Sequence, residues 1–191
     1  NIIPAQRIQS EATVNGQSRL LFVAELPSMG YRVFKLYTNV EEAPRFPKVF
    51  INENTIENNR FKLEFNLDTG CMKSFYDKKC DLEILRREGA RLAVIEDKSD
   101  TWSHNIFKFD KELGNMEVVS ARILEEGPVR STLRIKSKYQ TSYVIQDFRV
   151  YNELDHVEVK MIVDWREPLT MLKLKYPVDF NFRKPTYEIP Y

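Results

Sequence analysis

Residues 59–77 alternate apolar and polar side chains on either side of a short turn, and this pattern constrains the fold more than any other feature. Successive side chains of a β-strand point to opposite faces, so one face here is apolar and the other polar. The turn contains Gly70, which tolerates positive φ, and Asp68, whose side chain can hydrogen-bond the backbone two residues on. The stretch therefore predicts a β-hairpin with one face toward a core. The apolar face is expected to carry Phe61, Leu63, Phe65 and Leu67.

Strand-like patterns recur along the chain, whereas helical patterns are scarce. Residues 81–88 could form two helical turns, with Asp81 as N-cap and Gly89 as stop, but a strand followed by a loop fits them nearly as well. Because no long helix intervenes to permit parallel crossovers, the predicted fold class is all-β, an antiparallel sandwich. In the strongest pattern Trp165 is in phase with the apolar residues, which predicts a core or core-edge position. The candidate strands are residues 17–26, 31–37, 49–51, 116–124, 129–135, 143–151, 157–165 and 171–176.

Composition argues against several classes of function. The charged residues of this 191-residue chain balance to a net charge of +1, so no basic stripe marks a nucleic-acid partner. No apolar run approaches the ~20 residues that span a bilayer, and the first residues show no signal peptide. The glycines are isolated, so no phosphate-binding loop indicates a nucleotide cofactor. Cys71 and Cys80 could pair, but two cysteines make no disulfide framework. We expect reduced cysteines and a cytoplasmic protein.

Four stretches have the order and spacing of one known family: LPSMGYRVFKL (26–36), NNRFKLEFNLDTGCMKSFYDKK (58–79), VIEDKSDTWSHNIFKFD (94–110) and KYPVDFNFRKPTYEIPY (175–191). Together they resemble glycoside hydrolase family 38, the α-mannosidases. The second stretch is similar to the opening of the family's large C-terminal β-sandwich, and the first to the short β segment before it. The third is similar to the Asp-x-Trp loop of the bacterial branch, and the last to the passage toward a later turn. The resemblance covers most of the chain.

This resemblance implies a sandwich of the supersandwich type, which galactose mutarotase shares. Residues 1–48 would be a linking β segment, and residues 49–191 the first part of the large sandwich, cut short at its C-terminus. An unpaired sheet edge or exposed apolar surface would then be expected.

The resemblance also implies a division of labour with regions outside this sequence. Family members are retaining exo-glycosidases in which an N-terminal barrel carries the nucleophilic aspartate, a second carboxylate and a zinc ion bound by His and Asp. No position here matches those motifs. We therefore expect a non-catalytic domain, without a cofactor of its own, of an α-mannosidase whose zinc lies in the catalytic domain. Its expected partners are the mannoside substrate and the barrel and helical domains of the same enzyme, with no nucleic acid and no membrane.

The densest cluster of polar and aromatic residues lies at 96–104, and its candidate site residues are Asp100, Trp102 and His104. An aromatic face can stack on sugar C–H groups, and a carboxylate can accept hydrogen bonds from sugar hydroxyls. The resemblance suggests that this loop approaches the active site of the barrel from the side. The alternative is a surface loop in which a half-buried Trp102 anchors the chain and Asp100 caps the backbone. A shared, exposed concave surface would favour substrate binding.

Other chemistry has weaker support. Asp97 and Asp100 could be a catalytic carboxylate pair, but any acidic loop offers such pairs. Glu125 and Glu126 precede a Gly-Pro turn and are expected to be solvated. The only histidines, at 104 and 156, are far apart in sequence and provide no zinc site.

Three other functions stay open. A stand-alone carbohydrate-binding or adhesion module and a purely structural interaction domain are the competing classes. A mutarotase-like enzyme has only fold analogy in its favour.

Overall fold

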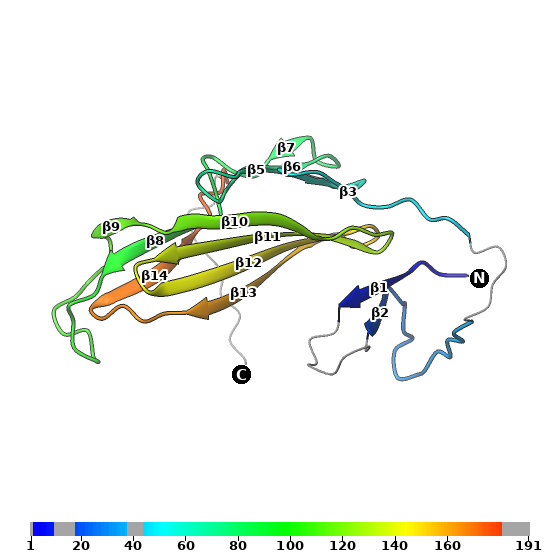
Figure 1. The fold of residues 1–191 in the computed structure, drawn as a ribbon, viewed down its shortest axis with the longest axis horizontal. Coiled ribbons are helices and arrows are strands. Elements are labelled where there is room, and N and C mark those ends of the chain that lie inside the picture. Colours follow the sequence, from blue (N-terminus) through cyan, green and yellow to red (C-terminus); the bar gives the residue numbers. More distant parts are fainter. Residues whose placement is uncertain (1, 10–17, 38–43, 181–191) are drawn as a thin grey trace.

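The computed structural model describes residues 2–9, 18–37 and 44–180, and these form β-strands and no helix. All strand pairs are antiparallel, and the strands are arranged in four sheets. Two layers pack face to face, and this arrangement confirms the prediction of an all-β antiparallel sandwich (Figure 1). None of the described residues belongs to a helix that could cross a lipid bilayer.

The first layer contains a five-stranded sheet built around the predicted hairpin. Phe61 pairs with Asp77 across it, and Gly70 has the expected positive φ of 69°. The capping side chain differs from the prediction, because Asn66 Oδ1 accepts the backbone N–H of Asp68 at 3.1 Å. The strands of this sheet are β3 (Phe50–Ile51), β4 (Thr55–Glu57), β5 (Phe61–Asn66), β6 (Cys71–Asp77) and β7 (Leu82–Glu83).

The second layer is a four-stranded sheet with an apolar inner face and a charged outer face. Its order along the sheet is β10-β11-β12-β13, so each strand pairs with its neighbour in sequence. Leu133 and Phe148 point inward, whereas the intervening Arg134 and Asp147 pair across the outer face. No described strand pairs with the far edge of β13, where Ile162 is exposed, so the expected unpaired edge is present. The bounds are β10 (Glu117–Glu125), β11 (Arg130–Tyr139), β12 (Ser142–Tyr151) and β13 (Val157–Asp164).

A three-stranded sheet extends the first layer at one end of the molecule. It contains β14 (Thr170–Lys175), β8 (Arg91–Glu96) and β9 (Glu112–Asn115), with β8 in the middle. β8 has a partner strand on each side, and its run of apolar residues is almost entirely buried. In Figure 1 this sheet and the loop from β8 to β9 lie at the left end, far from the N-terminal strands.

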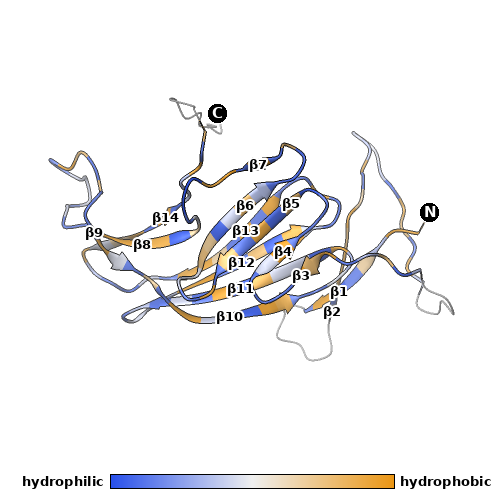
Figure 2. Cartoon of the chain, turned by 90° about the horizontal axis from the view of Figure 1, so that it is seen from above, coloured by the Kyte–Doolittle hydropathy of each residue, from blue (hydrophilic) through white to orange (hydrophobic). Residues whose placement is uncertain are grey.

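Two apolar clusters hold the layers together. In the larger one, Phe65 of the five-stranded sheet meets Phe148 of the four-stranded sheet, with ring centroids 4.7 Å apart. The smaller cluster joins β8 and β12 through Val94 and Val144. Trp165 is half-buried against it and stacks on a tyrosine ring, which confirms the predicted core-edge position. Figure 2 shows the resulting alternation of apolar and polar residues along the strands.

The N-terminal strands form a separate sheet. β1 (Ala5–Gln9) pairs with β2 (Ser18–Phe22), and a segment without regular structure follows, residues 23–37, here called the N-terminal segment. The predicted strand at 31–37 is wrong, because no described strand lies beside it to complete its backbone hydrogen bonds. Its apolar side chains are exposed, and Tyr31 retains 85% of its accessible surface.

Two further expectations concern the secondary structure of residues 81–88 and the domain boundary. The helical alternative for residues 81–88 is wrong: Leu82 and Glu83 pair with β6 instead, and Leu85 is buried in the core while bridging to Val178. The domain boundary after Lys48 stays a prediction. Part of the sequence used for it, residues 38–43, lies outside the described residues, as does most of the C-terminal stretch that resembles the family, residues 181–191.

Candidate functional site

The loop that carries the predicted site residues, residues 97–111, connects β8 to β9 and is here called the β8–β9 loop. Backbone and side-chain contacts close its base. Glu96 donates its backbone N–H to the carbonyl of Lys111 at 2.9 Å, and the Lys111 ammonium lies 3.0 Å from the Glu96 carboxylate. Asp97 N–H donates to the carbonyl of Leu169 at 2.8 Å. The loop therefore projects from a fixed base at the edge of the sandwich (Figure 1).

Two ion pairs next to the loop hold Glu112, the first residue of β9, in place. The Glu112 carboxylate lies 2.8 Å from Arg91 on β8 and also contacts Lys175 on β14. Hydrogen bonds from Arg91 and then from Lys175 lower the pKa of Glu112 to about 2. One carboxylate thus joins all three strands beneath the β8–β9 loop.

Asp100 organises the turn that presents the other two candidate residues. Its Oδ1 accepts the backbone N–H groups of Trp102 at 3.0 Å and His104 at 3.1 Å, which is the capping role of an Asx turn. Its Oδ2 lies 2.5 Å from His104 Nδ1. The hydrogen bond with the His104 side chain, followed by the backbone N–H donors, lowers the pKa of Asp100. The structure thus brings Asp100 and His104 into direct contact.

Trp102 lies beside this pair and is 81% exposed, so the half-buried anchor of the alternative interpretation is wrong. Phe107, in the same loop, is also fully accessible to solvent. The exposure of both rings is unusual because large aromatic side chains usually bury most of their surface. The two clefts described in the structure lie elsewhere, so the concave surface that would favour substrate binding is not part of either. Binding by these residues stays a prediction.

The other catalytic and metal hypotheses gain no geometric support. Asp97 Oδ1 accepts the backbone N–H and the hydroxyl of Ser99, so it caps a turn of its own. His156 packs against the ring of Tyr151, with centroids 6.0 Å apart, between β12 and β13. Within residues 2–9, 18–37 and 44–180, no three His, Cys, Asp or Glu side chains are grouped to hold a metal ion. The donor set therefore does not fit zinc in this part of the chain.

The sequence prediction missed a network of charged residues on the outer face of the four-stranded sheet. Glu125 was expected in a solvated turn, but its side chain is only 14% exposed. It accepts hydrogen bonds from Arg130 at 2.9 and 3.0 Å and from Thr132 at 2.9 Å. Arg130 also donates to the hydroxyl of Tyr151, which donates to Glu158 on β13 at 2.7 Å.

The same network continues toward the middle of the sheet. Arg134 makes a bidentate pair with Asp147, at 2.7 and 2.9 Å, and the Asp147 side chain is only 1% exposed. Arg149 donates to Glu158 at 2.7 Å. A signal was available in the sequence, since charged residues occupy the polar phase of successive strands. We call these residues the outer ion network: Glu125, Arg130, Thr132, Arg134, Asp147, Arg149, Tyr151 and Glu158.

Comparison with known proteins agrees with this architecture. Residues 56–191, which include the hairpin, most of the larger apolar cluster, the whole smaller one and the β8–β9 loop, match the model of the glycosyl hydrolases family 38 C-terminal domain. A search of curated proteins finds none that matches the chain. The family match covers well over half of the chain and coincides with the sandwich. The chain therefore belongs to glycosyl hydrolase family 38, of which it carries the C-terminal β-sandwich, a non-catalytic domain of a glycosidase.

Proposed function

We propose that this chain is part of an α-mannosidase and that its β8–β9 loop contacts the glycan substrate. The carrying observation is the exposed Trp102 held beside the Asp100–His104 pair. An exposed aromatic face next to a fixed carboxylate and an imidazole offers both stacking and hydrogen bonding to a sugar. The loop has the firm base that a binding residue needs, since its ends are tied to β8 and to Leu169.

The catalytic groups belong, in this proposal, to the barrel domain of the same enzyme, together with its zinc ion. Support comes from the family to which the chain belongs. The exposed apolar residues of the N-terminal segment support contact with other domains, because solvated apolar clusters of this kind mark interaction surfaces. A cytoplasmic location is part of the proposal and is supported by two free cysteines.

The test is Trp102→Ala in the enzyme that contains this chain, with an aryl α-mannoside and a mannose oligosaccharide as substrates. Loss of one stacking contact should raise KM for the oligosaccharide roughly three- to tenfold. Values of kcat should change little, because the reacting groups are elsewhere. The matched control is Phe50→Ala, which removes an exposed aromatic side chain on β3. Equal KM values in wild type, Trp102→Ala and Phe50→Ala would contradict the proposal.

A stand-alone carbohydrate-binding module is the second candidate, and the exposed pair Trp102 and Phe107 favours it. The two functions differ in what the isolated chain does. A binding module must bind mannosides by itself, whereas a domain of a composite pocket needs the catalytic domain. Titration of the isolated chain, followed by tryptophan fluorescence, separates them: saturable quenching that Trp102→Phe abolishes would favour the module.

A further inference from the structure

Apart from the β8–β9 loop, the structure contains a cleft of about 830 Å³ between β1 and the outer face of the four-stranded sheet. Figure 1 shows β1, which forms one wall of this cleft, at the end of the molecule opposite the β8–β9 loop. The volume of the cleft is in the range of small-molecule sites. We call it the arginine cleft, because its basic lining residues are Arg7, Arg19, Arg130, Arg134, Arg149 and Lys160.

Basic side chains outnumber acidic ones in this lining. Three carboxylates, those of Glu125, Glu126 and Asp147, stand against the six basic groups. Glu158 pairs with Arg149 from beside the cleft and adds a fourth. Arg7, Arg19 and Lys160 have further interactions within the chain, so the site is assigned on Arg134 and Arg149.

The guanidinium of Arg149 has one incompletely used edge. Its Nη1 donates to Glu158 at 2.7 Å, but its Nη2 reaches Asp147 only at 3.8 Å, beyond hydrogen-bonding distance. Its Nε is buried and has no partner. The Nε–Nη2 edge is the one that binds carboxylate and phosphate groups through two parallel hydrogen bonds. Asp147 does not fill it, because its Oδ2, which accepts from Arg134 at 2.9 Å, lies too far from Arg149 Nη2.

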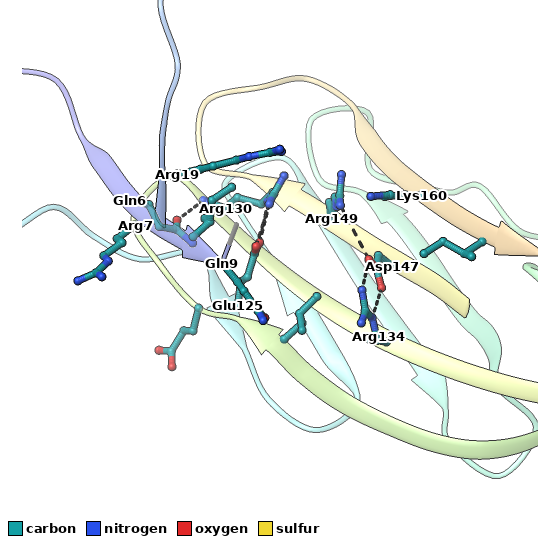
Figure 3. A pocket seen from close by; sticks show the side chains of 14 residues that line it. Gln6, Arg7, Gln9, Arg19, Glu125, Arg130, Arg134, Asp147, Arg149 and Lys160 are labelled. Atoms are coloured by element: carbon teal, nitrogen blue, oxygen red, sulfur yellow. Dashed lines mark hydrogen bonds and ion pairs between the residues drawn. The ribbon is translucent and has the colours of Figure 1, made fainter. Parts of the chain in front are cut away.

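The surrounding structure holds this arrangement in place. Asp147 is fully buried between two arginines, and Arg149 is 15% exposed at the cleft surface. Gln6 of β1 closes one end: its Oε1 accepts the backbone N–H groups of Val129 at 3.2 Å and Arg130 at 2.9 Å. Arg149 of β12 and Lys160 of β13 both line the cleft from these two paired strands (Figure 3). The groups that would contact a ligand are thus pre-organised by strands rather than by a loop.

We propose that the arginine cleft binds the oxyanion group, phosphate or carboxylate, of a small molecule, with Arg149 as the principal ligand-binding residue. The oxyanion supplies the acceptor that the Arg149 Nε–Nη2 edge lacks. Desolvated guanidinium donors form strong hydrogen bonds to ionised acceptors, so a single such group gives a specific anchor. The remaining cleft volume accommodates the uncharged part of the ligand.

The experiment measures binding to the full chain at low ionic strength by calorimetry, with inorganic phosphate, glucuronate and methyl α-mannoside as probes. Phosphate, glucuronate or both should bind, and the neutral mannoside should not bind at this site. Arg149→Gln should weaken the binding roughly tenfold, the loss of one charge-assisted pair. The matched control is Arg166→Gln, which removes an exposed arginine paired with Asp164 on the same sheet and should leave affinity within twofold.

The two charged probes distinguish the sources of the oxyanion. Preference for phosphate indicates a phosphorylated ligand, and preference for glucuronate indicates an acidic sugar. Binding of an acidic peptide without binding of either small anion would overturn the proposal, because the cleft would then serve a protein partner. Absence of binding by all charged probes, or equal weakening in Arg149→Gln and Arg166→Gln, would also overturn it.

A second readout removes the dependence on the Arg149→Gln variant, which could perturb the fold. The Nε–Hε signals of the arginines in a 15N spectrum report on each guanidinium in the wild-type chain. Addition of the bound anion should shift the Arg149 signal most and leave Arg166 unchanged. Shifts confined to exposed arginines would contradict the assignment of the site.

Discussion

The sandwich and the N-terminal segment have similar apolar patterns, but the apolar side chains are buried in the sandwich and exposed in the segment. In the sandwich, side chains such as Leu63 and Phe148 are fully buried between two layers. In the N-terminal segment, Tyr31, Val33 and Tyr37 are in phase with the same period of two but stay exposed. The difference lies in the neighbours: each sandwich strand has a partner strand and an opposing sheet, whereas residues 23–37 have no pairing strand among the described residues. Alternation therefore produces a strand only where backbone partners and a second layer are present.

The largest expected effect tests the sandwich side of this comparison. Phe148→Ala removes a fully buried ring that contacts Phe65. We expect the free energy of unfolding to fall by about 3–5 kcal/mol, measured by urea denaturation. Tyr31→Ala, the matched aromatic truncation in the N-terminal segment, should change it by less than about 0.5 kcal/mol. If the free energy of unfolding fell by similar amounts in both variants, the contrast between the sandwich and the N-terminal segment would be wrong.

The next effect concerns the outer face of the sandwich. Asp147→Asn removes the charge of a buried carboxylate and leaves Arg134 and Arg149 facing each other without it. We expect a loss of about 3 kcal/mol in urea denaturation, because an uncompensated charge remains at a desolvated position. Asp164→Asn, in an exposed pair with Arg166, is the control and should cost less than about 1 kcal/mol. If Asp147→Asn left the free energy of unfolding unchanged, the outer ion network would be solvated.

A smaller effect tests the junction between the two regions. Gln6 is buried over Gly127, and Gln6→Ala leaves two backbone N–H groups without their acceptor. We expect a loss of about 1–2 kcal/mol and faster hydrogen exchange at Val129 and Arg130. Gln9→Ala, at an exposed position of the same strand, should leave both quantities unchanged. Unaltered exchange in Gln6→Ala would mean that β1 is not docked through this side chain.

The smallest expected effect is a gain, not a loss, in the free energy of unfolding. The hydroxyl of Tyr176 is buried without a partner, and burial raises the pKa of Tyr176 from 10.0 to about 12. Tyr176→Phe should therefore stabilise the chain by about 1 kcal/mol at neutral pH. In the wild type the folded state retains the proton that the unfolded state loses above pH 10.0. Stability should thus fall as the pH rises toward about 12.

The variant supplies the control for this pH dependence. Tyr176→Phe should lack the part of the alkaline loss that Tyr176 contributes, so the two thermal unfolding curves should diverge above pH 10.0. Parallel pH profiles would show that the hydroxyl is solvated or hydrogen-bonded.

Local signals predicted local features well. The hairpin at 58–79 follows from its alternation and from Gly70, whose positive φ the structure confirms. The strand at 157–165 and the core-edge Trp165 follow from the same period of two. These features depend on residues that are neighbours in sequence or on one strand face, so a single sequence contains the information.

Features that depend on distant partners were mispredicted or missed. Residues 31–37 have the alternation of a strand but no described strand to pair with. Glu125 is mostly buried because it pairs with Arg130 across the turn, and nothing in the Glu-Glu-Gly-Pro stretch predicts that contact. The exposure of Trp102 likewise depends on how the β8–β9 loop leaves the sheet. Burial is set by the whole fold, which local periodicity does not specify.

Hydrogen exchange, measured on the isolated chain and on the enzyme that contains it, tests the comparison most directly. We predict slow exchange for the amides of β11 and β12 in both samples, because their hydrogen bonds open only with the sandwich. Residues 23–37 should exchange rapidly in the isolated chain and become protected in the enzyme, where other domains cover their apolar side chains. Protection of residues 23–37 in the isolated chain, or rapid exchange of them in the enzyme, would contradict this account.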